Sequence, residues 1–181
     1  ELDGPTTASA IVNAFAAGGT AFDVVFRDPE DGKRVRRSWR GDPTWGLGAF
    51  ARTPIFIVTS ASTGTLAEAV VHALRHHRGA RVLGAPTPGS GRITSWHELP
   101  WNAWFGFTVI EVFGPDGESL RNVPVVPDAC MAQGALVALS EANARVYAER
   151  CDANAVIAKD VAVEYVRAVL EPEPEPEPEP E

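Results

Sequence analysis

Hydroxyl side chains gather in a turn that directly follows the most apolar run of the chain. The run PIFIV occupies residues 54–58, and the turn TSASTGT occupies residues 59–65. A turn between a strand and a helix can hold a hydroxyl nucleophile at the helix N-terminus, where free backbone N–H groups stabilise developing negative charge. This pattern is common on its own, so its meaning depends on a general base and on the surrounding elements.

General bases and metal ligands are scarce near this turn. The two lysines, Lys33 and Lys159, lie far from it in the sequence. His76 and His77 are neighbours on a predicted helix and point in different directions, so they predict no metal site. The basic run at 75–78 is typical of a helix C-terminus, whose dipole favours cations. Because no CxxC or His spacing is present either, we expect neither a metal nor a cofactor.

Composition places the chain among globular domains. It has 181 residues, 45% hydrophobic content and a formal net charge of −8. Six of its 24 acidic residues lie in the final EPEPEPEPEPE, so residues 1–170 carry 18 acidic against 16 basic side chains. A body this close to neutral argues against nucleic-acid binding, and the basic run at 33–37 is expected to be the solvated face of a strand. No stretch approaches the ~20 apolar residues of a membrane span.

Hydrophobic periodicity predicts an α/β domain with a mixed sheet. The predicted elements are a helix over 7–15, hairpin strands over 21–26 and 33–39, a loop over 41–53, a strand over 54–58, a helix over 66–77, a strand over 80–83, a loop over 85–95, a half-buried strand over 105–113, and helices around 132–149 and 159–170. The continuous apolar run at 54–58 predicts a strand that is buried on both faces. The Glu-Pro repeat at 171–181 predicts an extended, disordered tail.

Two cysteines, Cys130 and Cys151, flank one of these predicted helices. In an exported protein they could pair and close a loop of twenty intervening residues. In a cytosolic protein they would be buried thiols, and the sequence favours neither reading.

Five segments, in this order, resemble the catalytic core of the carboxyl-terminal processing peptidases, also called tail-specific proteases. They are DPEDGK at 28–33, RGDPTWG at 40–46, IFIVTSASTGTLAEAVVHAL at 55–74, ARVLGAPTPGSGRI at 80–93 and FGPDGESLRNVPVVPD at 113–128. Each is common alone, but their order and spacing are fairly specific. On this resemblance we divide the chain into a partial catalytic core over 1–128, a helical segment over 129–170 and the tail over 171–181.

The resemblance implies a crotonase/Clp-protease-like core, a mixed sheet flanked by helices. It implies a serine-type peptidase outside the cytoplasm, periplasmic or secreted, which acts on or binds protein C-termini and unfolded polypeptide. In most of the family a Ser nucleophile works with a Lys base. The family's first strands have no counterpart here, so we expect an upstream segment of the same protein, or another chain, to complete the sheet.

The resemblance also implies the site residues. Aligned through Glu68, the nucleophile falls on Thr65 and the lysine falls on Ser90, so neither position keeps the family residue. Ser62 is the fallback nucleophile if residues 60–62 are the true equivalent. Thr65 suits a helix N-cap better than a nucleophile, and Ser90 cannot accept a proton at neutral pH. His72 lies two helical turns from Thr65, about 10 Å along the axis, which is too far for a direct hydrogen bond.

Backbone amides complete the implied site. The family's glycine-rich oxyanion segment falls on residues 4–7, so Thr6, Thr7 and Leu66 are the candidate donors. Two functions stay open: a peptidase that works weakly through Thr65, and a noncatalytic peptide-binding or scaffold domain that keeps the fold. Some relatives take a histidine base from an earlier segment, so the absence of the lysine alone does not decide between them.

An aromatic cluster follows the Ser90 loop. Trp96, His97 and Trp101 lie close to Trp104 and Phe105. Aromatic walls beside a strand edge suit a groove for an extended peptide. The same residues equally suit ordinary core that covers the sheet, and His97 suits a structural position in a loop.

Overall fold

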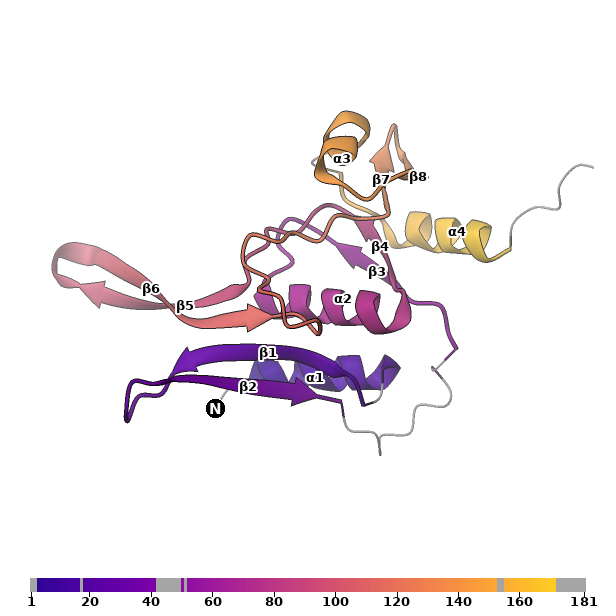
Figure 1. Ribbon diagram of the computed structural model, residues 1–181. Helices are drawn as coiled ribbons and strands as arrows, with labels where there is room; N and C mark the ends of the chain where they lie inside the picture. Colours follow the sequence, from indigo (N-terminus) through magenta and orange to yellow (C-terminus); the bar gives the residue numbers. More distant parts are fainter. Residues whose placement is uncertain (1–2, 17, 42–49, 51, 153–154, 172–181) are drawn as a thin grey trace, which may run out of the picture.

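The computed structural model describes residues 3–16, 18–41, 50, 52–152 and 155–171 (Figure 1). The helices are α1 (Asp3–Phe15), α2 (Thr65–Arg78), α3 (Ala144–Arg150) and α4 (Lys159–Leu170), with a short 3-10 turn, η1 (Pro100–Asn102). The strands are β1 (Thr20–Arg27), β2 (Arg34–Arg40), β3 (Phe56–Thr59), β4 (Arg81–Gly84), β5 (Arg92–Leu99), β6 (Ala103–Phe113), β7 (Ala129–Ala132) and β8 (Ala135–Ala138). The expected α/β core is confirmed.

The strands form two sheets of four. The first, sheet A, has the order β2-β1-β6-β5 and is antiparallel throughout. The second, sheet B, has the order β3-β4-β7-β8, in which β3, β4 and β7 run parallel and β8 runs antiparallel to β7. Helix α2 is the crossover between β3 and β4, and it lies between the two sheets (Figure 1).

Alternation of small and large apolar residues lets α2 pack on both sides. Ala69 and Ala73 join a buried cluster with Phe22, Val24 and Val112 of sheet A. Val71 packs on the other side with Val82, Val125 and Ile57. Because the helix is anchored to both sheets, its N-terminus is held in a fixed place relative to β3 and β5.

The end of α2 is fixed by its basic residues, which do more than solvate and cap the helix as expected. Arg78 donates to the backbone carbonyls of Phe15, Phe50 and Thr53. The His77 ring lies 2.8 Å from the carbonyl oxygen of Thr20. These contacts join the C-terminus of α2 to α1, to the start of β1 and to the approach to β3.

Several predicted elements differ from the observed ones. The strand at 54–58 was expected to be buried on both faces, but β3 is an edge strand and Val58 is 54% exposed. The loop predicted over 85–95 ends at Gly91, because β5 begins at Arg92. The arginines of the basic run at 33–37 lie on β2 and are exposed, as expected.

The largest error concerns residues 129–150. The helix predicted around 132–149 is instead the hairpin of β7 and β8 followed by the short helix α3. Gln133 and Gly134 both have positive φ, 52° and 84°, which is the turn geometry that joins two antiparallel strands. Both strands are rich in alanine, which has a high helix propensity, and this composition led to the wrong prediction of a helix. The helix predicted over 159–170 is confirmed as α4.

Two predictions lie largely or wholly outside the described residues, namely the loop over 41–53 and the tail over 171–181. In the part of the chain that the structure describes, no helix is long and apolar enough to cross a bilayer. No group of three or more His, Cys, Asp or Glu within the same residues is arranged to hold a metal ion.

Candidate functional site

The hydroxyl-rich turn closes on itself between β3 and α2. The Ser60 N–H donates to the Thr63 Oγ1 at 3.0 Å, and the Ser60 and Ser62 hydroxyls lie 2.9 Å apart. Gly64 is the N-cap of α2 and offers no side chain, so the expected cap role of Thr65 is wrong. Thr65 is the first helical residue.

The hydroxyl of Thr65 has a backbone partner. Its Oγ1 donates to the carbonyl oxygen of Arg92 at 2.9 Å, which ties the start of α2 to the start of β5. Among the described residues no lysine or histidine side chain forms a hydrogen bond with this hydroxyl. The proton of the candidate nucleophile is therefore directed toward an amide oxygen, which is a very weak base.

Ser90 is brought to the same end of α2 by a buried carboxylate. Glu68 is only 1% exposed, and its two oxygens accept the N–H groups of Gly89 at 2.5 Å and Ser90 at 3.0 Å. The structure thus places the loop that carries Ser90 beside the first turn of α2, which begins at Thr65. Glu68 is the residue that sequence reasoning used only as an alignment anchor, although a carboxylate in the first turn of an apolar helix face was a usable signal.

Backbone contacts hold this loop from its other side. The Asn122 N–H donates to the Gly89 carbonyl at 2.7 Å, and the Val112 N–H donates to the Gly91 carbonyl at 2.9 Å. Gly91 has φ +54°, and a Cβ there would collide with the backbone of residues 120 and 121. Position 91 therefore requires glycine, and the loop has little freedom to move toward or away from α2.

His72 does not act on Thr65 in this structure. Burial lowers the pKa of its imidazole, against weaker opposing effects from the Val123 backbone, Glu68 and Asp116. Its Nε2 is buried without a hydrogen-bond partner in the described part of the chain. A neutral imidazole one helical turn beyond Glu68 is thus a packing residue of α2.

The oxyanion candidates lie on two helices. Leu66 belongs to the first turn of α2, where backbone N–H groups have no intrahelical acceptor. Thr6 and Thr7 lie within α1, which begins at Asp3 and so includes the segment expected to precede the helix. The backbone N–H of Thr7 belongs to the helical hydrogen-bond pattern. The assignment of these three amides stays a prediction.

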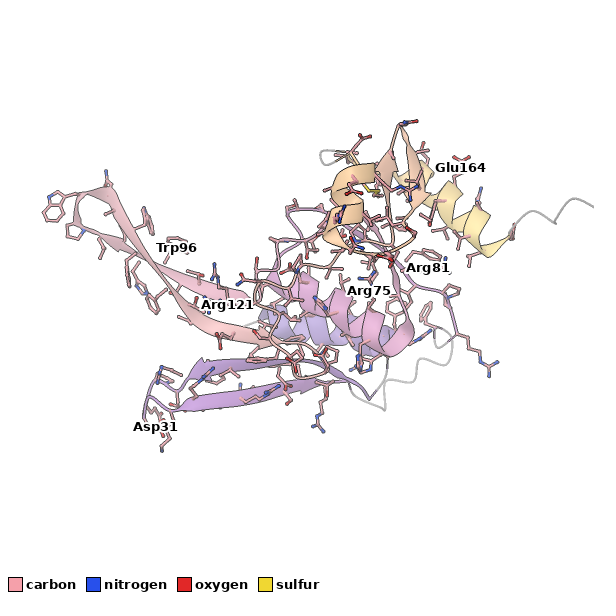
Figure 2. The ribbon with its side chains drawn as sticks, turned by 45° about the horizontal axis from the view of Figure 1, so that its top comes forward. Asp31, Arg75, Arg81, Trp96, Arg121 and Glu164 are labelled. Carbon is pink, nitrogen blue, oxygen red and sulfur yellow. A yellow bond between two sulfur atoms is a disulfide. The ribbon has the colours of Figure 1, made fainter. Side chains whose placement is uncertain are left out.

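The aromatic cluster lies on a long hairpin that projects from the body (Figures 1 and 2). Trp96 and His97 belong to β5, and Trp101 lies in η1 at the tip. His97 is therefore a strand residue, and the alternative that this cluster covers the sheet as core is wrong, because Trp96 is 63% and Trp101 95% exposed. From Arg92, which accepts the Thr65 hydrogen bond, seven residues of strand reach Leu99, a distance of about 23 Å. The tip is far from Thr65.

A partly buried ion pair that the sequence did not indicate lies at the other end of α2. Arg75 binds a carboxylate oxygen of Asp128 and donates to the Val126 carbonyl at 3.0 Å. The second Asp128 oxygen accepts the Val82 N–H at 2.7 Å. This contact joins α2 to β4 and to the start of β7, away from Thr65, so it has a structural role.

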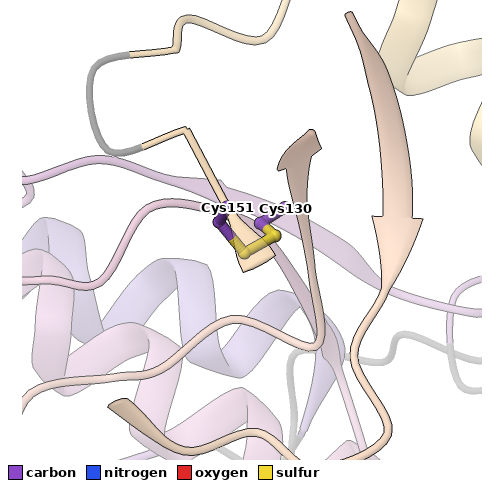
Figure 3. The surroundings of a disulfide bond; sticks show 2 residues. All are labelled: Cys130 and Cys151. Carbon is purple, nitrogen blue, oxygen red and sulfur yellow. A yellow bond between two sulfur atoms is a disulfide. The ribbon is translucent and has the colours of Figure 1, made fainter. Parts of the chain in front are cut away.

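The two cysteines are paired: a disulfide joins Cys130 of β7 to Cys151, the C-cap residue of α3 (Figure 3). The two Cα atoms are 5.8 Å apart. The bond attaches the α3 segment to sheet B.

Known proteins resemble this chain in sequence and in fold. The model of Peptidase family S41 matches residues 5–131. A carboxy-terminal-processing protease of Bartonella bacilliformis is 26% identical over 80 residues, which are 44% of this chain and 18% of that protein. The photosystem II D1 C-terminal processing protease shares the fold with a TM-score of 0.51 and 19% identity, covering 68% of this chain and 30% of that chain.

A putative S41 protease from Bacteroides fragilis matches with a TM-score of 0.47 and 15% identity, covering 63% of this chain and 31% of that chain. The chain thus spans less than a third of the length of each of these relatives.

Proposed function

Because the chain belongs to peptidase family S41, we propose that it binds extended polypeptide beside α2 without hydrolysing it. The observation that carries this proposal is the hydrogen bond from Thr65 to the Arg92 carbonyl. A hydroxyl nucleophile must give its proton to a base, and the position expected to hold that base is Ser90. A secondary alcohol without a base keeps its ordinary high pKa and does not attack an amide.

The binding surface is the free edge of β5. This strand is the last one of sheet A and pairs only with β6 among the described strands. An extended peptide can add to such an edge through main-chain hydrogen bonds. Its bound end would lie near Thr65, because β5 begins there, and Trp96 and His97 would contact its side chains. We include Thr65, Leu66 and Ser90 in this site as positions that contact peptide.

The disulfide supports a location outside the cytoplasm, periplasmic or secreted. Disulfides persist in oxidising compartments and are rare in the cytosol of mesophiles.

The free edge of β3 suits a further strand from another segment or chain. Val58 is exposed on a strand that pairs only with β4 in the described part of the chain. An upstream segment of the same protein, or another chain, would extend sheet B there.

The test combines binding and cleavage of one labelled unfolded polypeptide. We expect the native chain and Thr65→Ala both to bind it, and neither to release fragments. The Thr65→Ser, Ser90→Lys double variant reintroduces the family's nucleophile and base, and its cleavage activity would show that only these two groups had been lost. Ser140→Ala, an exposed change on the sheet B side, is the matched control.

Two results would overturn the proposal. Cleavage by the native chain that Thr65→Ala abolishes would make Thr65 the nucleophile of an active peptidase. Absence of polypeptide binding by all variants, with folding intact by circular dichroism, would remove the binding function itself.

A further inference from the structure

Large apolar side chains are exposed along the outer half of the β5–β6 hairpin. We call residues 96–107 the aromatic arm. Its exposed members include Leu99, Trp101, Trp104 and Phe105, and Trp101 is 95% and Trp104 61% exposed. From Leu99 to Ile110 the sequence LPWNAWFGFTVI contains no charged residue. A soluble surface rarely leaves so many neighbouring aromatic residues uncovered.

The apolar side chains occupy both faces of the arm. Residues that pair across an antiparallel ladder share a face. Trp96 pairs with Gly106, and a Cβ at Gly106 would collide with the Trp96 ring, so this ring lies flat over the glycine. His97 pairs with Phe105 on the opposite face, where the His97 and Phe107 rings stack with centroids 5.2 Å apart.

The turn at the tip exposes the side chain of Trp101. Trp101 and Asn102 have positive φ values of 65° and 57°, and this turn leaves the indole of Trp101 pointing into solvent. Positive φ is unusual for a bulky residue and costs conformational energy. The same pair of positive φ values joins β7 to β8, so this is the geometry of a hairpin turn, and it leaves the Trp101 side chain with almost no contact to the rest of the chain.

These observations together identify the kind of partner. A groove on another protein covers one face of a hairpin, whereas here both faces and the tip expose apolar side chains. Glu98, opposite Trp104, is the only Asp, Glu, Lys or Arg among residues 96–107. A medium that surrounds the tip on all sides fits this distribution. The interfacial layer of a lipid bilayer is such a medium, and Trp is enriched there because its ring is apolar and its N–H remains hydrogen-bonded.

We propose that the tip of the aromatic arm inserts into the interfacial layer of a lipid bilayer and holds the protein at the membrane surface. The depth is limited by the backbone. The outer edge of β5 has no partner strand among the described residues, and unpaired N–H and C=O groups are excluded from the hydrocarbon core. Leu99, Trp101, Trp104 and Phe105 therefore enter the interface, while the base of the arm stays in water.

The experiment measures cosedimentation of the complete chain with phosphatidylcholine vesicles, with and without added phosphatidylglycerol. We expect binding to the neutral vesicles that raised salt does not weaken, because it depends on apolar contact. Trp101→Ser with Trp104→Ser should lower the partition coefficient by at least about tenfold, since two indole rings are lost. Val156→Ser removes an apolar side chain that is 87% exposed outside the arm, and it should bind like the native chain.

Quenching of tryptophan fluorescence by bromine-labelled lipid gives a second readout. It should be strong in the native chain and weak in the double variant, whose remaining tryptophans lie nearer the base of the arm or outside it. Circular dichroism checks that all variants are folded.

Several outcomes would overturn the proposal. One is vesicle binding by the double variant that equals that of the native chain. Another is binding of the native chain that requires phosphatidylglycerol and disappears when the salt concentration is raised. Light scattering that shows a dimer lost in the double variant, without vesicle binding, would assign the arm to a second copy of the chain. Loss of polypeptide binding in the double variant, again without vesicle binding, would assign the arm to the peptide.

Discussion

Replacing Glu68 by Gln tests whether one buried carboxylate holds the Ser90 loop against α2. The native carboxylate accepts two backbone N–H groups, from Gly89 and Ser90. The amide of Gln keeps one acceptor oxygen and presents an NH₂ group to the other donor. One charge-assisted hydrogen bond is lost and two donors face each other in a site that excludes water.

The expected change in the free energy of unfolding follows from these contacts. A hydrogen bond to a charged group contributes about 1.5–3 kcal/mol, and a buried donor left without a partner costs a similar amount. We expect Glu68→Gln to lower the free energy of unfolding by about 2–4 kcal/mol. In a chain of this size that corresponds to a fall in Tm of about 5–15 °C. Urea titration followed by circular dichroism measures the change directly, with an unchanged m value.

The matched control is Glu98→Gln, which makes the same chemical change at an exposed position of β5. It should alter stability by less than about 0.5 kcal/mol. If Glu68→Gln unfolds at the same urea concentration as this control, the two hydrogen bonds do not hold the loop and the account of the site's geometry is wrong.

Two further predictions concern His72 and the disulfide. Burial lowers the His72 pKa from its ordinary 6.5, so the folded state disfavours the charged ring and native stability should fall as pH drops below about 6.5. In His72→Gln, thermal melts between about pH 7.5 and pH 5.5 should show a smaller loss of Tm, and an equal loss would refute this reasoning. Reduction of the Cys130–Cys151 bond frees a loop of twenty intervening residues and should cost about 3 kcal/mol by urea titration. Cys130→Ser with Cys151→Ser should unfold at the reduced midpoint with or without reductant, and a native midpoint unchanged by reductant would contradict the prediction.

The parts of the fold that the sequence predicted best are those whose local pattern agrees with their environment. The strand, turn and helix from β3 through α2 have an apolar run, small turn residues and an amphipathic stripe, so periodicity alone was sufficient. The segment at 129–150 failed because its alanines favour helix locally, while its pairing with β4 decides the structure. Such pairing depends on residues far away in the chain, which no local pattern reports.

In the candidate site, too, some features were predictable from the sequence and others were not. Alignment through Glu68 predicted Thr65 and Ser90 as the equivalent positions, and the structure brings the loop of Ser90 to the helix that Thr65 begins. The partner of the Thr65 hydroxyl was not predictable, because Arg92 contributes a backbone oxygen that carries no signal of residue type. The exposure of Trp101 was missed for a similar reason, since aromatic clusters occur in cores and on surfaces alike.

The pairing of β1 with β6 also determines the order in which this chain can fold. Phe26 lies opposite Ile110, so this register joins positions 84 residues apart, whereas β3, α2 and β4 are consecutive in the chain. Distant pairing is slow because the intervening chain must first lose conformational entropy. We therefore expect the β3–α2–β4 unit to form early and sheet A to close last. Until it closes, the apolar inner faces of β1 and β6 are exposed, and this interval is when the chain is most prone to aggregate.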